Sequence, residues 1–279
     1  MKIANALGRD RLAIVCISFI ALLLIGCVFA PWLTAFDPLY IDTARKLAEP
    51  DATHWLGTDH LGRDIFSRLL YGARITLGFS ILTMLVTASV GSLLGIMAGY
   101  MKGKVDNLLM RLCDIMVSFP GEVLILAIVG MLGPSLENVV LACIVAKFPW
   151  YTRMVRTITR KYTDMNYILY AKVAGFSTSY IIRRHLVPCA AGEIVVLATL
   201  DSGSIILLIS ALSFLGLGVQ PPTPEWGTML SEAKNIMTLY PWQMLPPGLA
   251  ILALVAAFNF LGDSLRDAFD PLHASGSSR

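Results

Sequence analysis

The chain has 279 residues, of which 56% are hydrophobic and only 15% are charged. Soluble domains carry about 25% charged residues, and here the apolar residues form long blocks, which excludes an ordinary soluble domain and predicts an integral membrane protein. The net charge of +3 is too small to indicate nucleic-acid binding.

Six apolar segments predict about six transmembrane helices, because a segment surrounded by lipid satisfies its backbone polar groups internally only as a helix. The first segment follows Lys2, Arg9 and Arg11. Its apolar run is longer than the core of a signal peptide, which has about 7–15 residues, and it is followed by Pro31 and Trp32. We therefore expect a helix that is retained rather than cleaved off. The six segments are residues 12–29, 75–97, 115–132, 139–150, 194–217 and 245–261. The predicted fold class is an all-α integral membrane protein.

The loops between these segments alternate between basic and non-basic. The N-terminal segment, the second loop and the fourth loop are rich in Lys and Arg, whereas the third loop has none and the fifth has only Lys234. Because cytoplasmic loops collect Lys and Arg, we expect both termini in the cytoplasm. The first loop contains both basic and acidic residues. We place it outside, because an even number of helices must connect the basic loops on the two sides of it.

The first loop ends in a short amphipathic stretch. Asp64 and Arg68 are four residues apart, a spacing that allows an ion pair across one helical turn. The apolar residues at helical spacing are Ile65, Phe66, Leu69 and Leu70. We therefore expect an amphipathic helix that lies at the outer membrane interface.

The second predicted helix has a face of small residues. Gly91, Gly95 and Gly99 recur at four-residue spacing, and such faces let helix backbones approach closely. The partner helix belongs either to this chain or to a second membrane subunit.

Three ionisable residues lie within predicted helices, where charge is costly and indicates function by default. Asp201 either lines a translocation path and attracts a cationic substrate, or caps a neighbouring helix, or pairs with an arginine. Glu122 follows Pro120 and Gly121 at a loosened helix start and is a second path residue. Lys147, near the cytoplasmic end of its helix, is expected to extend its ammonium group to the interface.

The sequence lacks the patterns of nucleotide-binding, hydrolytic and metal sites. There is no G-x-x-x-x-G-K-[ST], H-E-x-x-H or G-x-S-x-G. His54 and His60 are six residues apart without cysteine partners, so we assign them a structural or surface role. The five cysteines stand singly, which argues against a disulfide framework and a zinc site. We expect no catalytic residue, metal ligand or cofactor.

The longest predicted cytoplasmic loop, residues 151–193, contains a distinctive pattern. Residues 171–175 read Ala-Lys-Val-Ala-Gly, an amphipathic stretch follows at 180–186, and Pro188 comes next. Small residues before a glycine allow a short helix, a tight turn and close approach by another protein. Pro188 is predicted to end the helix that follows the turn.

Three further motifs cover the rest of the chain. They are HWLGTDHLGRDIFSR at 54–68, FLGLG at 214–218 followed by PPTPEWGTML at 221–230, and FNFLGDSLRDAFDP at 258–271. In order and spacing, and together with the 171–188 pattern, they resemble the second (C-type) permease subunit of the dipeptide, oligopeptide and nickel ABC importers. The chain is most similar to nickel-importer permeases.

The resemblance implies a type I importer permease fold in the inner (plasma) membrane, with a cytoplasmic coupling helix that contacts an ATPase. Leu169 and Tyr170 replace a glutamate and an alanine that often open the coupling motif, so no particular salt bridge to the ATPase is implied. The implied coupling residues are Ala171, Lys172, Ala174, Gly175, Phe176 and Ser177. The implied partners are a second permease, two ATP-binding subunits, which hydrolyse the ATP, and an external substrate-binding protein.

The predicted function is import of nickel, free or chelated. The first loop and residues 150–156 and 196–201 resemble nickel permeases, whereas residues 221–230 match dipeptide permeases equally well. Di- or oligopeptide import is therefore the alternative. A secondary transporter is less favoured because no inverted repeat is visible. We divide the chain into an N-terminal region, 1–74, and a permease core, 75–279.

Overall fold

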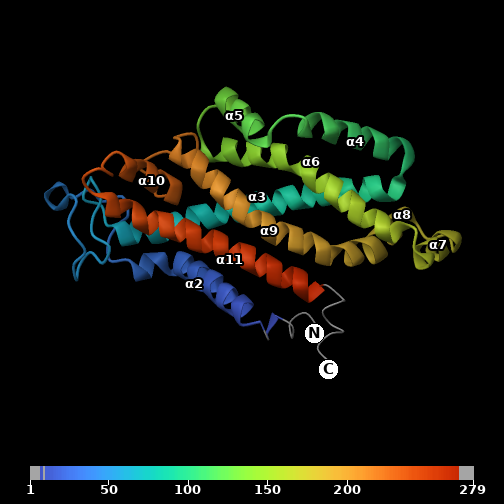
Figure 1. Ribbon diagram of the computed structural model, residues 1–279, viewed down its shortest axis with the longest axis horizontal. Helices are drawn as coiled ribbons and strands as arrows, with labels where there is room; N and C mark the ends of the chain where they lie inside the picture. Colours follow the sequence, from blue (N-terminus) through green and yellow to red (C-terminus); the bar gives the residue numbers. More distant parts are fainter. Residues whose placement is uncertain (1–6, 9, 270–279) are drawn as a thin grey trace.

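The computed structural model describes residues 7–8 and 10–269 as a bundle of long helices (Figure 1). In the described residues the extended pairing is limited to one isolated bridge between Thr58 and Asp64. The longer helices are α2 (Arg11–Leu33), α3 (Ile65–Met101), α4 (Gly103–Val117), α5 (Gly121–Leu132), α6 (Leu136–Thr163), α9 (Val187–Phe214) and α11 (Leu245–Phe269). The shorter ones are η1 (Thr43–Arg45), α7 (Asn166–Val173), α8 (Thr178–Ile181), η2 (Ile182–Leu186), α10 (Trp226–Lys234) and η3 (Pro241–Met244).

Four of these segments are long and apolar enough to cross a membrane: Arg11–Leu33, Ile65–Met101, Thr178–Phe214 and Pro241–Phe269. Helices α4 and α5 meet at 81° and count as a fifth span if they are taken together. This architecture confirms the predicted all-α membrane fold. The remaining predicted segment, 139–150, lies inside α6. This helix is 28 residues long but carries more charged residues than the four apolar spans.

Helices α2, α11 and α9 run side by side, and α4 and α5 lie along the opposite edge of the bundle, beyond α6 (Figure 1). One apolar core joins α2, α3, α10 and α11, with Trp226 fully buried in it. The indole N–H of Trp226 also donates to the Leu69 carbonyl, over 2.9 Å. A second core joins α5, α6 and α9 around Val129 and Cys143. Burial of these apolar side chains fixes how the helices pack.

The glycine face of α3 packs against α6 of the same chain. A Cβ atom on Gly91 would lie 2.3 Å from the Cβ of Tyr151, and one on Gly95 would lie 2.7 Å from the Thr152 carbonyl oxygen. Only glycine permits so close an approach of the two backbones. The predicted small-residue contact therefore lies within this chain.

Several predicted boundaries differ from the structure. The predicted third span, 115–132, covers α5 and only the last three residues of α4, and the two helices meet at 81° with Pro120 at the N-cap of α5. Helix α6 runs to Thr163, so much of the predicted fourth loop is helical. The prediction that Pro188 ends a helix is wrong, because the chain stays helical from Thr178 to Phe214. Residues 182–186 form a π-type turn just before Pro188, in which the Val187 N–H donates to the Ile182 carbonyl.

Residues 65–70 form the first turns of α3 rather than a separate helix, and Ile65 and Arg68 are buried there. The predicted pairing of Asp64 with Arg68 is also wrong. Asp64 caps α3 by accepting from the Ser67 N–H over 2.7 Å and lies 2.9 Å from His54 Nδ1. His54 therefore has the structural role expected from the sequence.

Candidate coupling segment and translocation face

The coupling pattern folds into a short helix that ends in a tight turn. The Phe176 N–H donates to the Ala171 carbonyl and the Gly175 N–H to the Lys172 carbonyl, both over 3.1 Å. This pair of bonds is a Schellman motif, which places a residue with positive φ just after the helix. Gly175 occupies that position with φ of +79°. Ser177 then caps α8 by accepting from the Tyr180 N–H.

This turn presents large apolar side chains outward. Val173 is 88% exposed and Tyr170 is 74% exposed. Phe176 and Tyr180 stack on each other with ring centroids 4.8 Å apart, and both are exposed. Exposed apolar clusters of this kind are typical of protein-binding surfaces.

The opposite side of the same segment is anchored to the bundle. Ile168, Ala171, Ile181 and Leu186 form a buried cluster between α7, α8 and η2. The Lys172 ammonium group lies over the ring of Tyr100 at the end of α3, 4.8 Å from its centroid. Because η2 continues directly into α9, the turn is mechanically joined to a membrane-spanning helix.

Helices α7 and α8 lie at one end of the bundle, and α10 with the α2–α3 loop lies at the other (Figure 1). The start of α2 and the end of α11 lie near each other, because the Ser264 hydroxyl donates to Asp10 over 2.5 Å. Phe269, at the end of α11, packs against Gly192 near the start of α9. These helix ends therefore lie toward the end of the bundle that carries the coupling segment.

Asp201 and Lys147 form a polar cluster between α9 and α6. The Lys147 ammonium donates to an Asp201 carboxylate oxygen over 2.5 Å and to the Ser204 hydroxyl over 2.9 Å. The Tyr151 hydroxyl donates to the other carboxylate oxygen over 3.2 Å. Asp201 thus pairs with a lysine, whereas the sequence suggested an arginine. Lys147 lies within α6, with its ammonium group turned to Asp201 rather than to the interface.

Glu122 lies apart from this cluster. It is exposed in the first turn of α5, after Pro120 and Gly121, as the sequence suggested. The structure therefore does not bring the two predicted path residues together.

A cavity of about 790 Å³ lies between α6, α9 and α11, on the coupling side of the cluster. Lys161 donates to Glu193 across it over 3.1 Å. Its apolar wall includes Met154, Leu197 and Leu200. None of the residues of the Lys147–Asp201 cluster lines this cavity, and Leu200 packs against Gly262 of α11.

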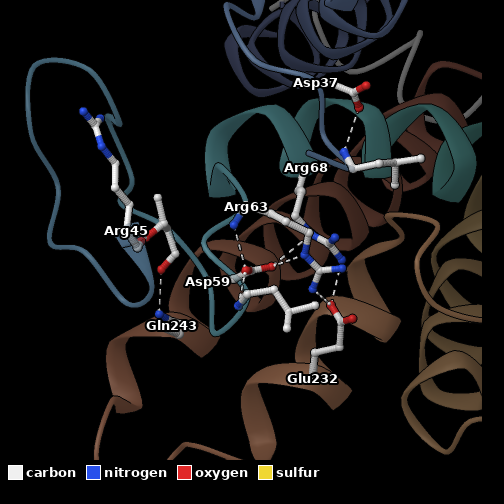
Figure 2. A network of polar contacts seen from close by, with 10 residues as sticks. Asp37, Arg45, Asp59, Arg63, Arg68, Glu232 and Gln243 are labelled. Atoms are coloured by element: carbon white, nitrogen blue, oxygen red, sulfur yellow. Dashed lines mark hydrogen bonds and ion pairs between the residues drawn. The ribbon is translucent and has the colours of Figure 1, made fainter. Parts of the chain in front are cut away.

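At the other end of the bundle, four charged residues form a buried network. Figure 2 shows the guanidinium groups of Arg63 and Arg68 between Asp59 and Glu232. Arg63 donates to Asp59 over 2.6 Å and to Glu232 over 3.0 Å, and Arg68 donates to Glu232 over 2.7 Å. Both arginine side chains are 1% exposed. The network ties the α2–α3 loop and the start of α3 to α10.

Sequence reasoning missed three acidic residues that join distant helices. Glu225 is fully buried and accepts from the Thr76 hydroxyl over 3.0 Å and the Thr228 N–H over 2.9 Å. Burial raises the pKa of the Glu225 carboxyl. Asp106 is buried and pairs with Arg156 and Arg160, which joins α4 to α6. Glu225 and Glu232 lie in a segment of mixed polar and apolar residues, 221–234, which gave no local signal of the partners that they meet on other helices.

In the described part of the chain, no group of three or more His, Cys, Asp or Glu side chains could hold a metal ion. The charged clusters instead pair acids with Lys and Arg. These pairs join helices that are distant in the sequence.

Comparison with known proteins places this geometry in a family. Residues 91–273 match the family described as "Binding-protein-dependent transport system inner membrane component". The chain belongs to this family. Residues 3–50 also match the "N-terminal TM domain of oligopeptide transport permease C". The chain is thus a multi-pass inner-membrane permease subunit of an ABC importer.

Three relatives match over nearly the whole chain. The nickel transport system permease protein NikC of Escherichia coli (strain K12) is 41% identical, covering 94% of this chain and 93% of its own. The dipeptide transport system permease protein DppC of Alkalihalophilus pseudofirmus is 41% identical, covering 95% and 87%. The metal-staphylopine import system permease protein CntC of Staphylococcus aureus (strain NCTC 8325 / PS 47) is 42% identical, covering 97% and 94%. These names confirm the C-type resemblance but differ in substrate.

A solved structure shares the fold. The MetNI methionine ABC transporter, in an inward-facing conformation, superposes with a TM-score of 0.59 and 17% identity. The match covers 74% of this chain and 98% of the solved one. It confirms the type I importer permease fold.

Proposed function

We propose that this chain, paired with a second permease, forms the translocation path of an importer for nickel, free or chelated. An external binding protein delivers the substrate, and two ATP-binding subunits supply the energy by hydrolysing ATP. Import of di- or oligopeptides is the alternative function. Both rest on membership of the importer family and differ only in cargo.

The observation that carries this proposal is the α7–α8 turn. It exposes Tyr170 and Val173 to a partner while Ile168 and Ile181 are buried against the bundle. An ATPase that moved this turn would also move α9, because η2 joins the two without a loop. We therefore assign ATPase coupling to Ala171, Lys172, Ala174, Gly175, Phe176 and Ser177. A photo-cross-linker attached through the thiol of a Val173→Cys variant should give a covalent cross-link to the ATPase in the assembled complex.

Replacing Gly175 with valine should lower ATP-driven uptake at least tenfold while the protein still inserts and assembles. The open space around Gly175 holds no atom within 4 Å of an added Cβ, so the effect comes from φ of +79° rather than from a clash. A β-branched residue is strained there by about 1–3 kcal/mol, which should displace the turn. The measurement is uptake per assembled complex.

Gly175→Asn is the matched control, because asparagine tolerates positive φ better than other non-glycine residues. It should retain most of the uptake. Full uptake by the Gly175→Val complex would contradict the assignment of this turn to coupling.

We also propose that both termini face the cytoplasm, on the side of the coupling turn. The alternation of basic loops supports this orientation. The bond between Asp10 and Ser264 holds the two ends of the described chain together. We keep the division into an N-terminal region, 1–74, and a permease core, 75–279, as part of the same proposal.

Nickel is preferred as cargo because of the likeness to NikC and CntC, whose names refer to nickel and to metal–staphylopine. The likeness to DppC supports the peptide alternative. Uptake of radiolabelled nickel and of a labelled dipeptide should be compared in a strain that lacks this chain. Loss of nickel uptake alone supports the preferred cargo, and loss of dipeptide uptake alone supports the alternative. We also propose that Asp201 and Glu122 line the translocation path.

A further inference from the structure

The Lys147–Asp201 cluster lies in the middle of its two helices. Asp201 is the fifteenth of the 28 residues of α9, and Lys147 is the twelfth of the 28 residues of α6. At 1.5 Å per residue, each is roughly 15 Å or more from either end of its helix. Both residues therefore lie well inside their helices, away from the ends where a charged side chain reaches the interface.

The cluster is not sealed inside the chain. The Lys147 side chain is 23% exposed and that of Asp201 is 12% exposed, while Ser204 is exposed on the same face. Charged groups at this depth almost always face the interior of an assembly or water rather than lipid. The exposed side of the cluster therefore faces a second subunit or an aqueous path.

A cavity at the coupling end of the same helices carries a similar ion pair. It lies between α6, α9 and α11, and its lining includes Leu197 and Leu200 but none of the residues of the Lys147–Asp201 cluster. Lys161 and Glu193 form a second ion pair in this cavity. The α6–α9 face thus presents a lysine paired with an acid at two depths.

We propose that Lys147 determines the charge selectivity of the translocation path by neutralising Asp201 beside Ser204. An unpaired Asp201 carboxylate at this depth would attract and retain a bare divalent cation. The paired cluster presents a cation, an anion and a hydroxyl together, which suits a substrate that carries both charges or none overall. This inference rests on the proposed path function and, within it, favours a chelated metal or a zwitterionic peptide over free nickel.

A thiol introduced in place of the Ser204 hydroxyl can report the local charge directly. That hydroxyl lies 2.6 Å from an Asp201 oxygen and 2.9 Å from the Lys147 nitrogen. Ser204→Cys would be introduced into the complete importer together with Cys189→Ser, because Cys189 is exposed and the other four cysteines are buried. The labelling rates of a cationic and an anionic methanethiosulfonate reagent of similar size would be compared, each relative to its rate with a free thiol.

In the paired cluster we expect comparable relative rates for the two reagents. Adding Lys147→Met should raise the cation-to-anion ratio roughly tenfold or more, because a full charge acts over a few ångströms in a medium of reduced dielectric. Adding Asp201→Asn should lower the ratio by a similar factor, and combining both changes should return it toward its original value. An ion pair turned away from the aqueous path would leave the thiol unreactive toward both reagents, whatever its charge.

Leu22→Cys is the control for lipid exposure, since Leu22 is 68% exposed on α2 and lies in an apolar segment. It should resist both reagents. If the thiol of the Ser204→Cys variant also resists both, or if Lys147→Met leaves the ratio unchanged, the inference is overturned. Labelling needs no ATP hydrolysis, so its failure in a complex that hydrolyses ATP normally would leave the proposed function intact.

Discussion

Replacing Arg68 with methionine is expected to lower the free energy of unfolding of the protein by about 3–5 kcal/mol. Arg68 is 1% exposed and shares Glu232 with Arg63 (Figure 2). The native network holds two positive and two negative charges, so the substitution leaves one buried carboxylate without compensation. Unfolding in detergent micelles, followed by tryptophan fluorescence, would measure the loss.

Two variants make this prediction specific. Lys102→Met removes an exposed pair with Asp164, whose side chain is 69% exposed, and should cost no more than about 1 kcal/mol. The double change Arg68→Met and Glu232→Met leaves Arg63 paired with Asp59 and should recover at least half of the lost stability. A single Arg68→Met variant as stable as the native protein would contradict a structural role for the network.

Replacing Gly95 with valine should separate α3 from α6 and lower stability by about 3 kcal/mol or more, at the upper end of measured overpacking costs. An added Cβ would lie 2.7 Å from the Thr152 carbonyl oxygen and 2.9 Å from the Arg156 nitrogen. Because both atoms belong to the backbone, no side-chain rotation relieves the contact. Assembly and unfolding of the purified complex are the measurements.

Gly78→Ala is the matched control, because Gly78 lies in the same helix with no atom within 4 Å of an added Cβ. It should be neutral or stabilising by up to about 1 kcal/mol, since alanine is the better helix former. A Gly95→Val variant as stable as the native protein would contradict the close α3–α6 approach as the reason for glycine at this position.

Short sequence patterns predicted the features that depend on neighbouring residues, namely the apolar helices and the turn at Gly175. Apolar blocks located the membrane helices, and small residues before Gly175 predicted a turn that the Schellman motif then forms. The bend between α4 and α5 was not predicted, although the Pro-Gly-Glu sequence at 120–122 interrupts the apolar run and indicated a loosened helix start there. Helix α6 was ended too early because its second half is charged, yet Arg156 and Arg160 face Asp106 from another helix.

The sequence did not predict which charged residues on different helices form ion pairs. Asp201 and Lys147 are 54 residues apart, and Glu232 is 164 residues from Arg68. Helix packing alone determines which acid meets which base, so a single sequence leaves several partners open. The substrate is equally undetermined by local pattern, because relatives with similar identity are named for nickel, dipeptide and metal–staphylopine transport.

ATP hydrolysis by the reconstituted complex tests the central claim most directly. This chain would be assembled in proteoliposomes with its partner permease and ATP-binding subunits, and hydrolysis measured with and without the substrate-loaded binding protein. We expect the loaded binding protein to stimulate hydrolysis several-fold, and the Gly175→Val complex to lose that stimulation. A native complex whose hydrolysis does not respond to the loaded binding protein would contradict the assignment of this chain as an importer permease.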